Sequence, residues 1–270
     1  MDTRTVTQEV FFNALPHEVF EAFLDSKQHA EFSGSPAQID RRPGGVFSVF
    51  DGAITGKTLE IENDNRIVQA WHSREWPSGH FSQLTLNLTP IYEGRGTRLS
   101  LEQIGVPAKA ADDISKGWQV YYWGKLAEYL RARKIAPVRK FLEEFKNHAN
   151  IDIVDQTWTA DCLLHVPGMT LPRGRDAQKN VGRMIFAAFG NVHVEVNDTI
   201  VEGDRVVERH TATAVHKGEF MGIPASGKMV SWTENHIYRI ADGKIAETWS
   251  EVSFHDLLKQ IAPAKDTAAA

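Results

Sequence analysis

The first half of the chain has short segments in which apolar and polar residues alternate, interrupted by one segment of helical periodicity. Residues Thr5–Phe12 alternate roughly, which is typical of a strand. From Pro16 onward the apolar residues recur at helical spacing, and Pro16 suits the first turn of a helix because no backbone donor is needed there. Turn residues separate the further predicted strands, which are Phe47–Phe50, Thr58–Glu60, Ile67–Ser73, Ser82–Leu88 and Arg98–Gln103.

A long amphipathic helix is predicted over Asp112–Arg131, because its large apolar residues follow one another at three- and four-residue steps. An antiparallel sheet must cover its apolar face, and a helix laid across it leaves a hollow in between. The first half therefore predicts an α+β domain with a long C-terminal helix and an internal cavity.

The segment Lys134–Pro137 predicts a domain boundary, because Pro137 disfavours helix at the residue before it and starts a new segment. Beyond it we expect helices at Val138–Asn147 and Phe254–Ile261, a helical turn running to Trp158, and a helix capped by Asp176. The predicted strands are Asp161–Val166, Val192–Thr199, Arg205–Val215, Met229–Ile240 and Lys244–Val252. These elements predict a second α+β domain, a cone-shaped barrel with a curved antiparallel sheet around a pocket. We thus expect domains at residues 1–133 and 138–262, followed by a disordered tail at 263–270.

The composition argues against several classes of partner. The formal net charge is −5 with no clustered basic face in the sequence, so nucleic acid is not an expected partner. No apolar stretch is long enough to span a bilayer, and the N-terminus has no apolar signal core, so no membrane partner is expected. The single cysteine, Cys162, excludes an internal disulfide and favours the cytoplasm.

Five motifs in the first half form an ordered set: Gly44–Phe47, Ile67–Trp71, Trp76–Phe81, Gly96–Leu99 and Gly117–Tyr122. With them, residues 5–131 resemble the activator-of-heat-shock-ATPase family, a START-like (SRPBCC) branch with a helix-grip fold. The resemblance implies a hydrophobic ligand-binding or docking module. The eukaryotic co-chaperones of this family carry a further N-terminal domain with no counterpart here, so a heat-shock chaperone is not an expected partner.

Four aromatic residues of this half, Trp71, Trp76, Trp118 and Tyr122, are candidates to line an apolar ligand cavity. The alternative is that they form ordinary core, where each large side chain contributes about 1.5–3 kcal/mol on burial.

The second half carries another set of motifs: Asp161–Gly168, Gly174–Asp176, Glu202–Val207, His216–Lys228 and Tyr238–Trp249. Through them, residues 138–262 resemble the SnoaL-like polyketide (ester) cyclases of the nuclear-transport-factor-two-like fold. The resemblance implies a conical pocket and, in the enzyme members, cofactor-free acid–base chemistry on a polyketide ester. Where those enzymes place an Asp after the tryptophan that matches Trp249, this chain has Ser250.

Strand alternation over Ser231–Arg239 puts Trp232, Glu234, His236 and Tyr238 on one face. His236 matches the pocket histidine of the enzyme members, and Glu234 could replace the missing carboxylate. Candidate catalytic residues are therefore Glu234, His236 and Ser250, and the candidate ligand-binding residues are His165, His210, Trp232, Tyr238 and Trp249. The alternative is that Glu234 pairs with a surface Lys or Arg and that His236 satisfies a core hydrogen bond. We expect no metal, because no His-x-His or Cys-x-x-Cys spacing is present.

The leading functional hypothesis is binding of a small apolar carbonyl compound in the C-terminal pocket, with cofactor-free cyclisation, isomerisation or hydrolysis as its chemistry. The alternative is a carrier or stress-associated accessory protein without chemistry. A homodimer through the C-terminal domain is also expected, since apolar strand residues such as Val194, Val196, Val206 and Ile237 need cover.

Overall fold

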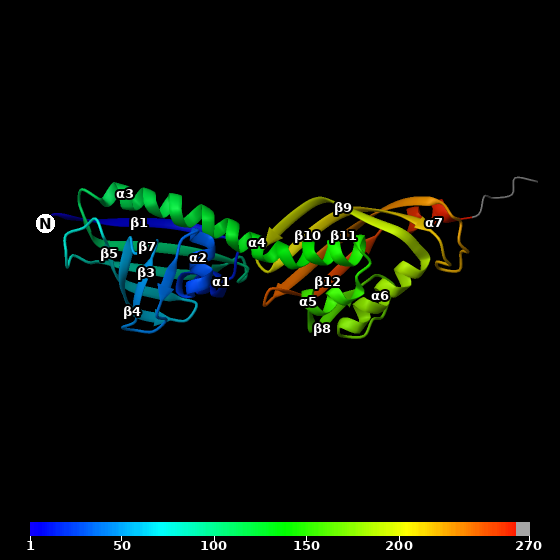
Figure 1. The fold of residues 1–270 in the computed structure, drawn as a ribbon, viewed down its shortest axis with the longest axis horizontal. Coiled ribbons are helices and arrows are strands. Elements are labelled where there is room, and N and C mark those ends of the chain that lie inside the picture. Colours follow the sequence, from blue (N-terminus) through cyan, green and yellow to red (C-terminus); the bar gives the residue numbers. More distant parts are fainter. Residues whose placement is uncertain (263–270) are drawn as a thin grey trace, which may run out of the picture. The chain divides into compact units, whose positions relative to one another are not determined.

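The computed structural model describes residues 1–262, and the chain divides into two compact units, one covering Met1–Ala132 and one beginning at Arg133. Each unit combines helices with one β-sheet, which confirms the predicted α+β class (Figure 1). The expected tail at 263–270 lies outside the described residues.

The N-terminal unit is built on a seven-stranded antiparallel sheet of order β1-β7-β6-β5-β4-β3-β2. Its first strand pairs with its last, with β1 at the edge of the sheet and β7 next to it. The short helices α1 (Pro16–Leu24) and α2 (Ser26–Ser33) meet at Asp25, whose carboxylate accepts a hydrogen bond from the backbone of Gln28 and caps α2. The strands are β1 (Thr3–Phe12), β2 (Ala37–Ile39), β3 (Val46–Val49), β4 (Ile54–Glu62), β5 (Arg66–Ser73), β6 (Ser82–Ile91) and β7 (Gly96–Pro107).

The helix that follows the sheet is longer than predicted. It runs through α3 (Ala111–Gly117), the π-helical segment η1 (Trp118–Trp123), α4 (Gly124–Phe141) and the π-helical segment η2 (Leu142–Asn147). The prediction that Pro137 disfavours helix before it and starts a new segment is wrong, because Pro137 lies inside α4. An interior proline costs about 3 kcal/mol. Burial of Val138 and Phe141 in the core of the second unit, at about 1.5–3 kcal/mol each, offsets this cost.

The C-terminal unit contains a five-stranded sheet of order β8-β12-β11-β10-β9, in which β8 is parallel to β12 and the other pairs are antiparallel. Trp158 begins β8 rather than ending a helix, and the residue that caps α6 is Gly174 at φ 106°, with Asp176 in the first turn. The elements are η3 (Ile151–Ile153), α5 (Val154–Thr157), β8 (Trp158–His165), α6 (Arg175–Ala188), β9 (Phe189–Glu202), β10 (Arg205–His216), β11 (Met229–Ala241), β12 (Lys244–Val252) and α7 (Phe254–Ile261).

Helices cover one face of this sheet and leave alternate strand residues facing them. Gly182 of α6 lies so close to η2 that a Cβ added there would be 2.4 Å from the ring of Phe145, so glycine is needed for this approach.

Val194 and Val206 are buried in cores of this unit and offer no surface to a second subunit, whereas Val196 on β9 is 37% exposed. The residues proposed above for a dimer face therefore do not share one surface.

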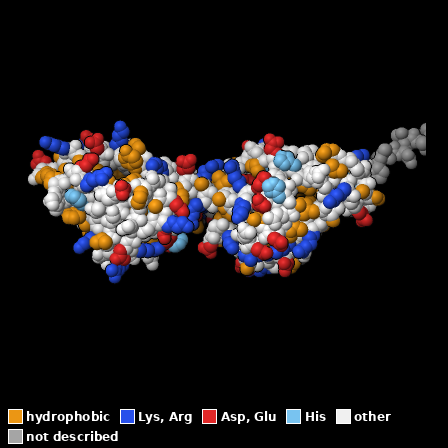
Figure 2. Space-filling view, in the orientation of Figure 1, with side chains coloured by type: hydrophobic (Ala, Val, Ile, Leu, Met, Phe, Trp, Pro, Cys, Tyr) orange, Lys and Arg blue, Asp and Glu red, His pale blue; other side chains and the backbone are white. Residues whose placement is uncertain are grey.

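The described surface carries charges of both signs. On the face that Figure 2 shows, Lys and Arg side chains are interspersed with Asp and Glu over both units, with no basic face in this view. None of the helices within residues 1–262 is both long and apolar enough to cross a lipid bilayer.

Candidate functional site

A pocket of about 90 Å³ lies within the C-terminal unit, lined by the sheet, by α6 and α7, and by residues of the long helix. Most of its lining is apolar, and the aromatic residues in it are Phe141, Trp158, Phe189, Phe220, Trp232, Tyr238 and Phe254. The polar residues in the lining are Lys146, Gln178, Glu234, His236, Thr248 and Ser250. An apolar pocket with a few convergent polar groups is the usual form of a small-molecule site.

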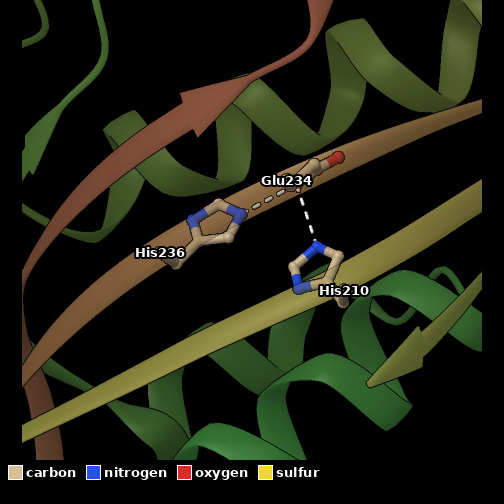
Figure 3. A group of neighbouring side chains, drawn as sticks. All are labelled: His210, Glu234 and His236. Carbon is tan, nitrogen blue, oxygen red and sulfur yellow. Dashed lines mark hydrogen bonds and ion pairs between the residues drawn. The ribbon is translucent and has the colours of Figure 1, made fainter. Parts of the chain in front are cut away.

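Strand register brings the polar groups together. On β11 buried and exposed residues alternate, so the predicted set Trp232, Glu234, His236 and Tyr238 faces the pocket, and this prediction is confirmed. His210 of β10 lies directly opposite Glu234, and Ser250 of β12 lies directly opposite His236. Figure 3 shows the two imidazole rings, from neighbouring strands, both directed at the carboxylate of Glu234.

Glu234 is buried and surrounded by donors. Its Oε2 lies 2.8 Å from His236 Nε2, 3.1 Å from His210 Nε2 and 3.2 Å from Lys146 Nζ, and its Oε1 accepts a 2.7 Å bond from Trp232 Nε1. Burial by itself raises the pKa of Glu234, but the Lys146 ammonium and the bonds from the two histidines hold that pKa well below its ordinary 4.5. Glu234 is therefore an ionised acceptor whose positions are filled, which makes it a poor general base.

His236 links Glu234 to Ser250. Its Nδ1 is 2.9 Å from Ser250 Oγ. An ionised carboxylate only accepts, so Nε2 of His236 carries a hydrogen toward Glu234, and Nδ1 keeps the lone pair that accepts from the Ser250 hydroxyl. Burial lowers the pKa of His236, and the bond that it donates to Glu234 opposes this effect without overcoming it. His236 is therefore a neutral imidazole whose Nδ1 lone pair points to Ser250 in the pocket lining.

Lys146 belongs to this site, and we did not name it from the sequence. It lies on η2, four residues after the buried Leu142 and next to the buried Phe145. The sequence does carry a signal for it: a lysine at helical spacing within an apolar face predicts a buried ammonium, and such a group is rarely buried without an acidic partner.

The three residues His210, Glu234 and His236 place one possible ligand atom each within 4.8 Å of one another, as a metal site would. The Lys146 ammonium lies 3.2 Å from the same carboxylate oxygen and would repel a cation there. The contacts thus suit a hydrogen-bonded cluster better than a metal centre.

Three of the predicted ligand-binding residues, Trp249, His165 and His210, do not line the pocket. Trp249 lies on the opposite face of β12 from Ser250 and stacks on His165 at 5.1 Å between ring centroids. The guanidinium carbon of Arg205 also lies over its ring. His165 is exposed and pairs with Glu247 at 2.8 Å. The prediction that they line the pocket is wrong, because the period of two along a strand sends Trp249 and Ser250 to opposite faces. His210 is fully buried and does not line the pocket; it bonds to Glu234 and stacks on His236 at 4.9 Å between ring centroids.

The four aromatic residues proposed for the N-terminal unit do lie together. Trp71 is 5.7 Å from Trp76 and 5.9 Å from Trp118, and Trp118 is 4.3 Å from Tyr122, between ring centroids. The internal cavity beside three of them is only about 10 Å³, close to the space of one water molecule. An open groove of about 670 Å³ is lined by the same three residues and is edged by the exposed residues Val120 and Tyr121. The packing is that of a core with an apolar groove above it.

His29 is buried in this unit among aromatic rings, 4.8 Å from Phe32 and 5.7 Å from Tyr122 between centroids. Burial lowers the pKa of His29 to about 4, and its Nδ1 has no hydrogen-bond partner among the described residues. It is a neutral core histidine at pH 7.

Comparison with known proteins finds a matching family model for residues in each unit. Residues 13–131 match the family model described as "Activator of Hsp90 ATPase homolog 1-like protein", and residues 136–261 match that of "SnoaL-like polyketide cyclase". Both resemblances inferred from the motifs are confirmed over these residues.

The N-terminal half is 31% identical over 121 residues to activator of 90 kDa heat shock protein ATPase homolog 1 of Homo sapiens, covering 45% of this chain and 35% of that protein. It is 32% identical over 122 residues to an uncharacterized protein of Schizosaccharomyces pombe, covering 45% of this chain and 36% of that protein. The chain thus spans about a third of the length of these curated relatives.

Several solved structures match about half of the chain each. TsrD from Streptomyces laurentii is 26% identical with a TM-score of 0.45, covering 49% of this chain and 96% of its own. The putative polyketide cyclase IdmH from Streptomyces antibioticus is 27% identical with a TM-score of 0.43, covering 47% and 96%. An HSP90 activator from Plasmodium falciparum is 25% identical with a TM-score of 0.42, covering 49% and 94%.

Proposed function

We propose that the C-terminal unit binds a small, largely apolar carbonyl compound and catalyses proton transfer on it, with His236 as the proton carrier. The observation that supports this most is the neutral imidazole of His236, which lines an apolar pocket and is held from behind by the ionised Glu234. The match of residues 136–261 to the SnoaL-like cyclases agrees with cyclisation or isomerisation as the reaction class.

The chemistry needs a base that removes a proton next to a carbonyl group. Nδ1 of His236 is unprotonated and its lone pair accepts from the Ser250 hydroxyl, so it takes the substrate proton through that hydroxyl, or directly once the hydroxyl turns away. Glu234 then stabilises the imidazolium that forms, because its 2.8 Å bond to Nε2 becomes an ion pair. This assignment replaces the earlier hypothesis that Glu234 itself is the base, since its oxygens already accept from four groups.

α-Hydrogen exchange of a small ketone tests the proposal. Cyclohexanone in D₂O, followed by NMR, should exchange faster with the protein than in buffer, and its resonances should report binding. His236→Gln should slow the exchange by about 10²–10⁴-fold while leaving binding within a few-fold, the share expected of a positioned base. His193→Gln is the matched control, because His193 is exposed on β9 and lies outside the pocket lining. Binding with no exchange above buffer would instead identify a carrier, and no binding at all would refute the proposal.

For the N-terminal unit we propose a docking module, supported by the exposed Val120 and Tyr121 beside the apolar groove and by the likeness to heat-shock-ATPase activators. Stimulation of the ATPase activity of a 90 kDa heat-shock protein by the full chain would identify the co-chaperone form of this function. Tyr121→Glu should then remove the effect. Unchanged ATPase activity with the full chain would exclude that form and leave a different protein or a hydrophobic ligand for the groove.

A further inference from the structure

Three side chains of the C-terminal pocket form a hydrogen-bonded chain in the order hydroxyl, imidazole, carboxylate. Ser250 Oγ lies 2.9 Å from His236 Nδ1, and His236 Nε2 lies 2.8 Å from Glu234 Oε2. The three residues occupy two adjacent strands, with Ser250 of β12 opposite His236 of β11, and all three line the pocket. A nucleophile, a base within hydrogen-bond reach and a third group that orients the base are what activated serine enzymes require, on whatever fold they occur.

The protonation states suit this order. Glu234 is ionised by its Lys146 partner and its hydrogen bonds, so it fixes the hydrogen of the imidazole on Nε2. The lone pair on Nδ1 is therefore directed at the Ser250 hydroxyl, as activation of that hydroxyl needs.

The pocket also contains buried donors without a partner. Trp158 Nε1 and Thr248 Oγ1 are buried and have no hydrogen-bond partner within residues 1–262, and both residues line the pocket. Thr248 lies two positions before Ser250 on the same face of β12. Unsatisfied buried donors cost free energy unless a bound group accepts from them, and a carbonyl oxygen is such a group. This observation is independent of the chain formed by Ser250, His236 and Glu234, and it indicates a carbonyl ligand.

We propose that this pocket is a serine acyl-transfer site, with Ser250 as the nucleophile and a small carboxylic ester as the substrate class. The inference rests on the proposed function only in using the same pocket and the same imidazole. Ser250 Oγ forms a bond to the ester carbonyl carbon while its proton passes to His236 Nδ1, and Trp158 and Thr248 donate to the carbonyl oxygen. The bond from the acyl carbon to the alcohol oxygen then breaks, and the alcohol leaves with the proton from His236. Water then attacks the acyl carbon of the acyl-serine and gives a proton to His236. The bond from the acyl carbon to Ser250 Oγ breaks, and Ser250 recovers the proton from His236. In total, one ester and one water become one acid and one alcohol.

Covalent labelling with diisopropyl fluorophosphate tests the nucleophile, and 4-nitrophenyl acetate tests turnover. Peptide mass spectrometry should find a single phosphorylated residue, Ser250, and the nitrophenyl ester should give a burst of nitrophenolate. Ser250→Ala should remove both signals, and His236→Gln should slow labelling by about 10²–10⁴-fold. Ser231→Ala is the matched control, since Ser231 is exposed on the opposite face of β11, and it should be labelled like the parent.

Thermal unfolding shows whether each variant is folded. If Ser250→Ala does not fold, Ser250→Cys keeps the shape of the side chain, and its fluorophosphate labelling should also fall to background. Absence of label on Ser250 in the folded parent, or labelling that persists in Ser250→Ala, would overturn the inference. Cyclohexanone exchange that depends on His236 but occurs without Ser250 labelling would refute the serine nucleophile and leave the proposed function standing.

Discussion

The imidazole of His236 accepts a hydrogen bond from the hydroxyl of Ser250, with 2.9 Å between Nδ1 and Oγ. The side chain at position 250 therefore determines which group contacts the Nδ1 lone pair of His236. With serine it meets a hydroxyl that can be activated, and with a carboxylate it would meet a second negative charge beside Glu234.

Ser250→Asp should remove the serine nucleophile and favour proton transfer. The new carboxylate faces the pocket next to His236, raises the pKa of that imidazole and supplies a second base, so cyclohexanone exchange should rise while fluorophosphate labelling disappears. The free energy of unfolding should fall by about 1–3 kcal/mol, because a polar group is buried without its full set of partners. Ser250→Asn is the neutral control of the same shape. Equal exchange rates for the Asp and Asn variants would contradict this prediction.

Glu234→Gln should destabilise the C-terminal unit by about 3–5 kcal/mol, because it leaves the buried ammonium of Lys146 without its counter-charge. Urea denaturation followed by circular dichroism measures the loss. The double variant Glu234→Gln with Lys146→Met should recover most of it, since no charge is left unpaired. The control is Glu143→Gln, whose partner His148 is exposed, and it should change stability by about 1 kcal/mol or less. A double variant no more stable than Glu234→Gln alone would mean that the ion pair does not carry the effect.

His29 should make stability fall as the solution becomes acidic. Its pKa in the folded chain is lowered to about 4 from 6.5, so the unfolded chain binds the proton more tightly. The loss is absent above pH 6.5, grows as pH falls from 6.5 to 4, and reaches about 3 kcal/mol from a shift worth 1.36 kcal/mol per pH unit. His29→Gln should remove this part of the pH dependence, as measured by urea unfolding at a series of pH values. His17→Gln, at an exposed residue paired with Asp64, should keep it; a parent and His29→Gln with parallel pH profiles would refute the prediction.

The two halves should fold separately. Fragments 1–132 and 133–270 follow the division between the compact units, and each carries its own core cluster. Each fragment should unfold in one cooperative transition, measured by circular dichroism in urea. Failure of both fragments to show a cooperative transition would place the boundary elsewhere.

Self-association through the C-terminal unit stays a prediction, now with Val196 kept from the earlier set and Ile200 added. Strand β9 lies at the edge of its sheet and exposes Ile200 at 62% and Val196 at 37%. An exposed edge with apolar side chains is a common pairing surface. Sedimentation at tens of micromolar should show a dimer, and Ile200→Lys should shift it toward monomer. A parent that sediments only as monomer would refute the expectation.

Alternation and helical spacing determined which elements form and which way many side chains face. The period of two on β11 placed Trp232, Glu234, His236 and Tyr238 on one face. That conclusion holds because backbone geometry fixes side-chain direction locally. Local rules misjudged Pro137, because the burial of its apolar neighbours in the second core is a tertiary effect that propensity does not contain.

The chemistry of the site was decided only by tertiary structure. The sequence pointed to Glu234 as a carboxylate of interest, but its role depends on Lys146, 88 residues away, and on His210 across the strand pair. The register of β11 with β12 sets His236 opposite Ser250, and no local pattern reports the register of two strands. A residue type shows which proton it can carry, but its protonation state depends on the groups that packing places within hydrogen-bond distance.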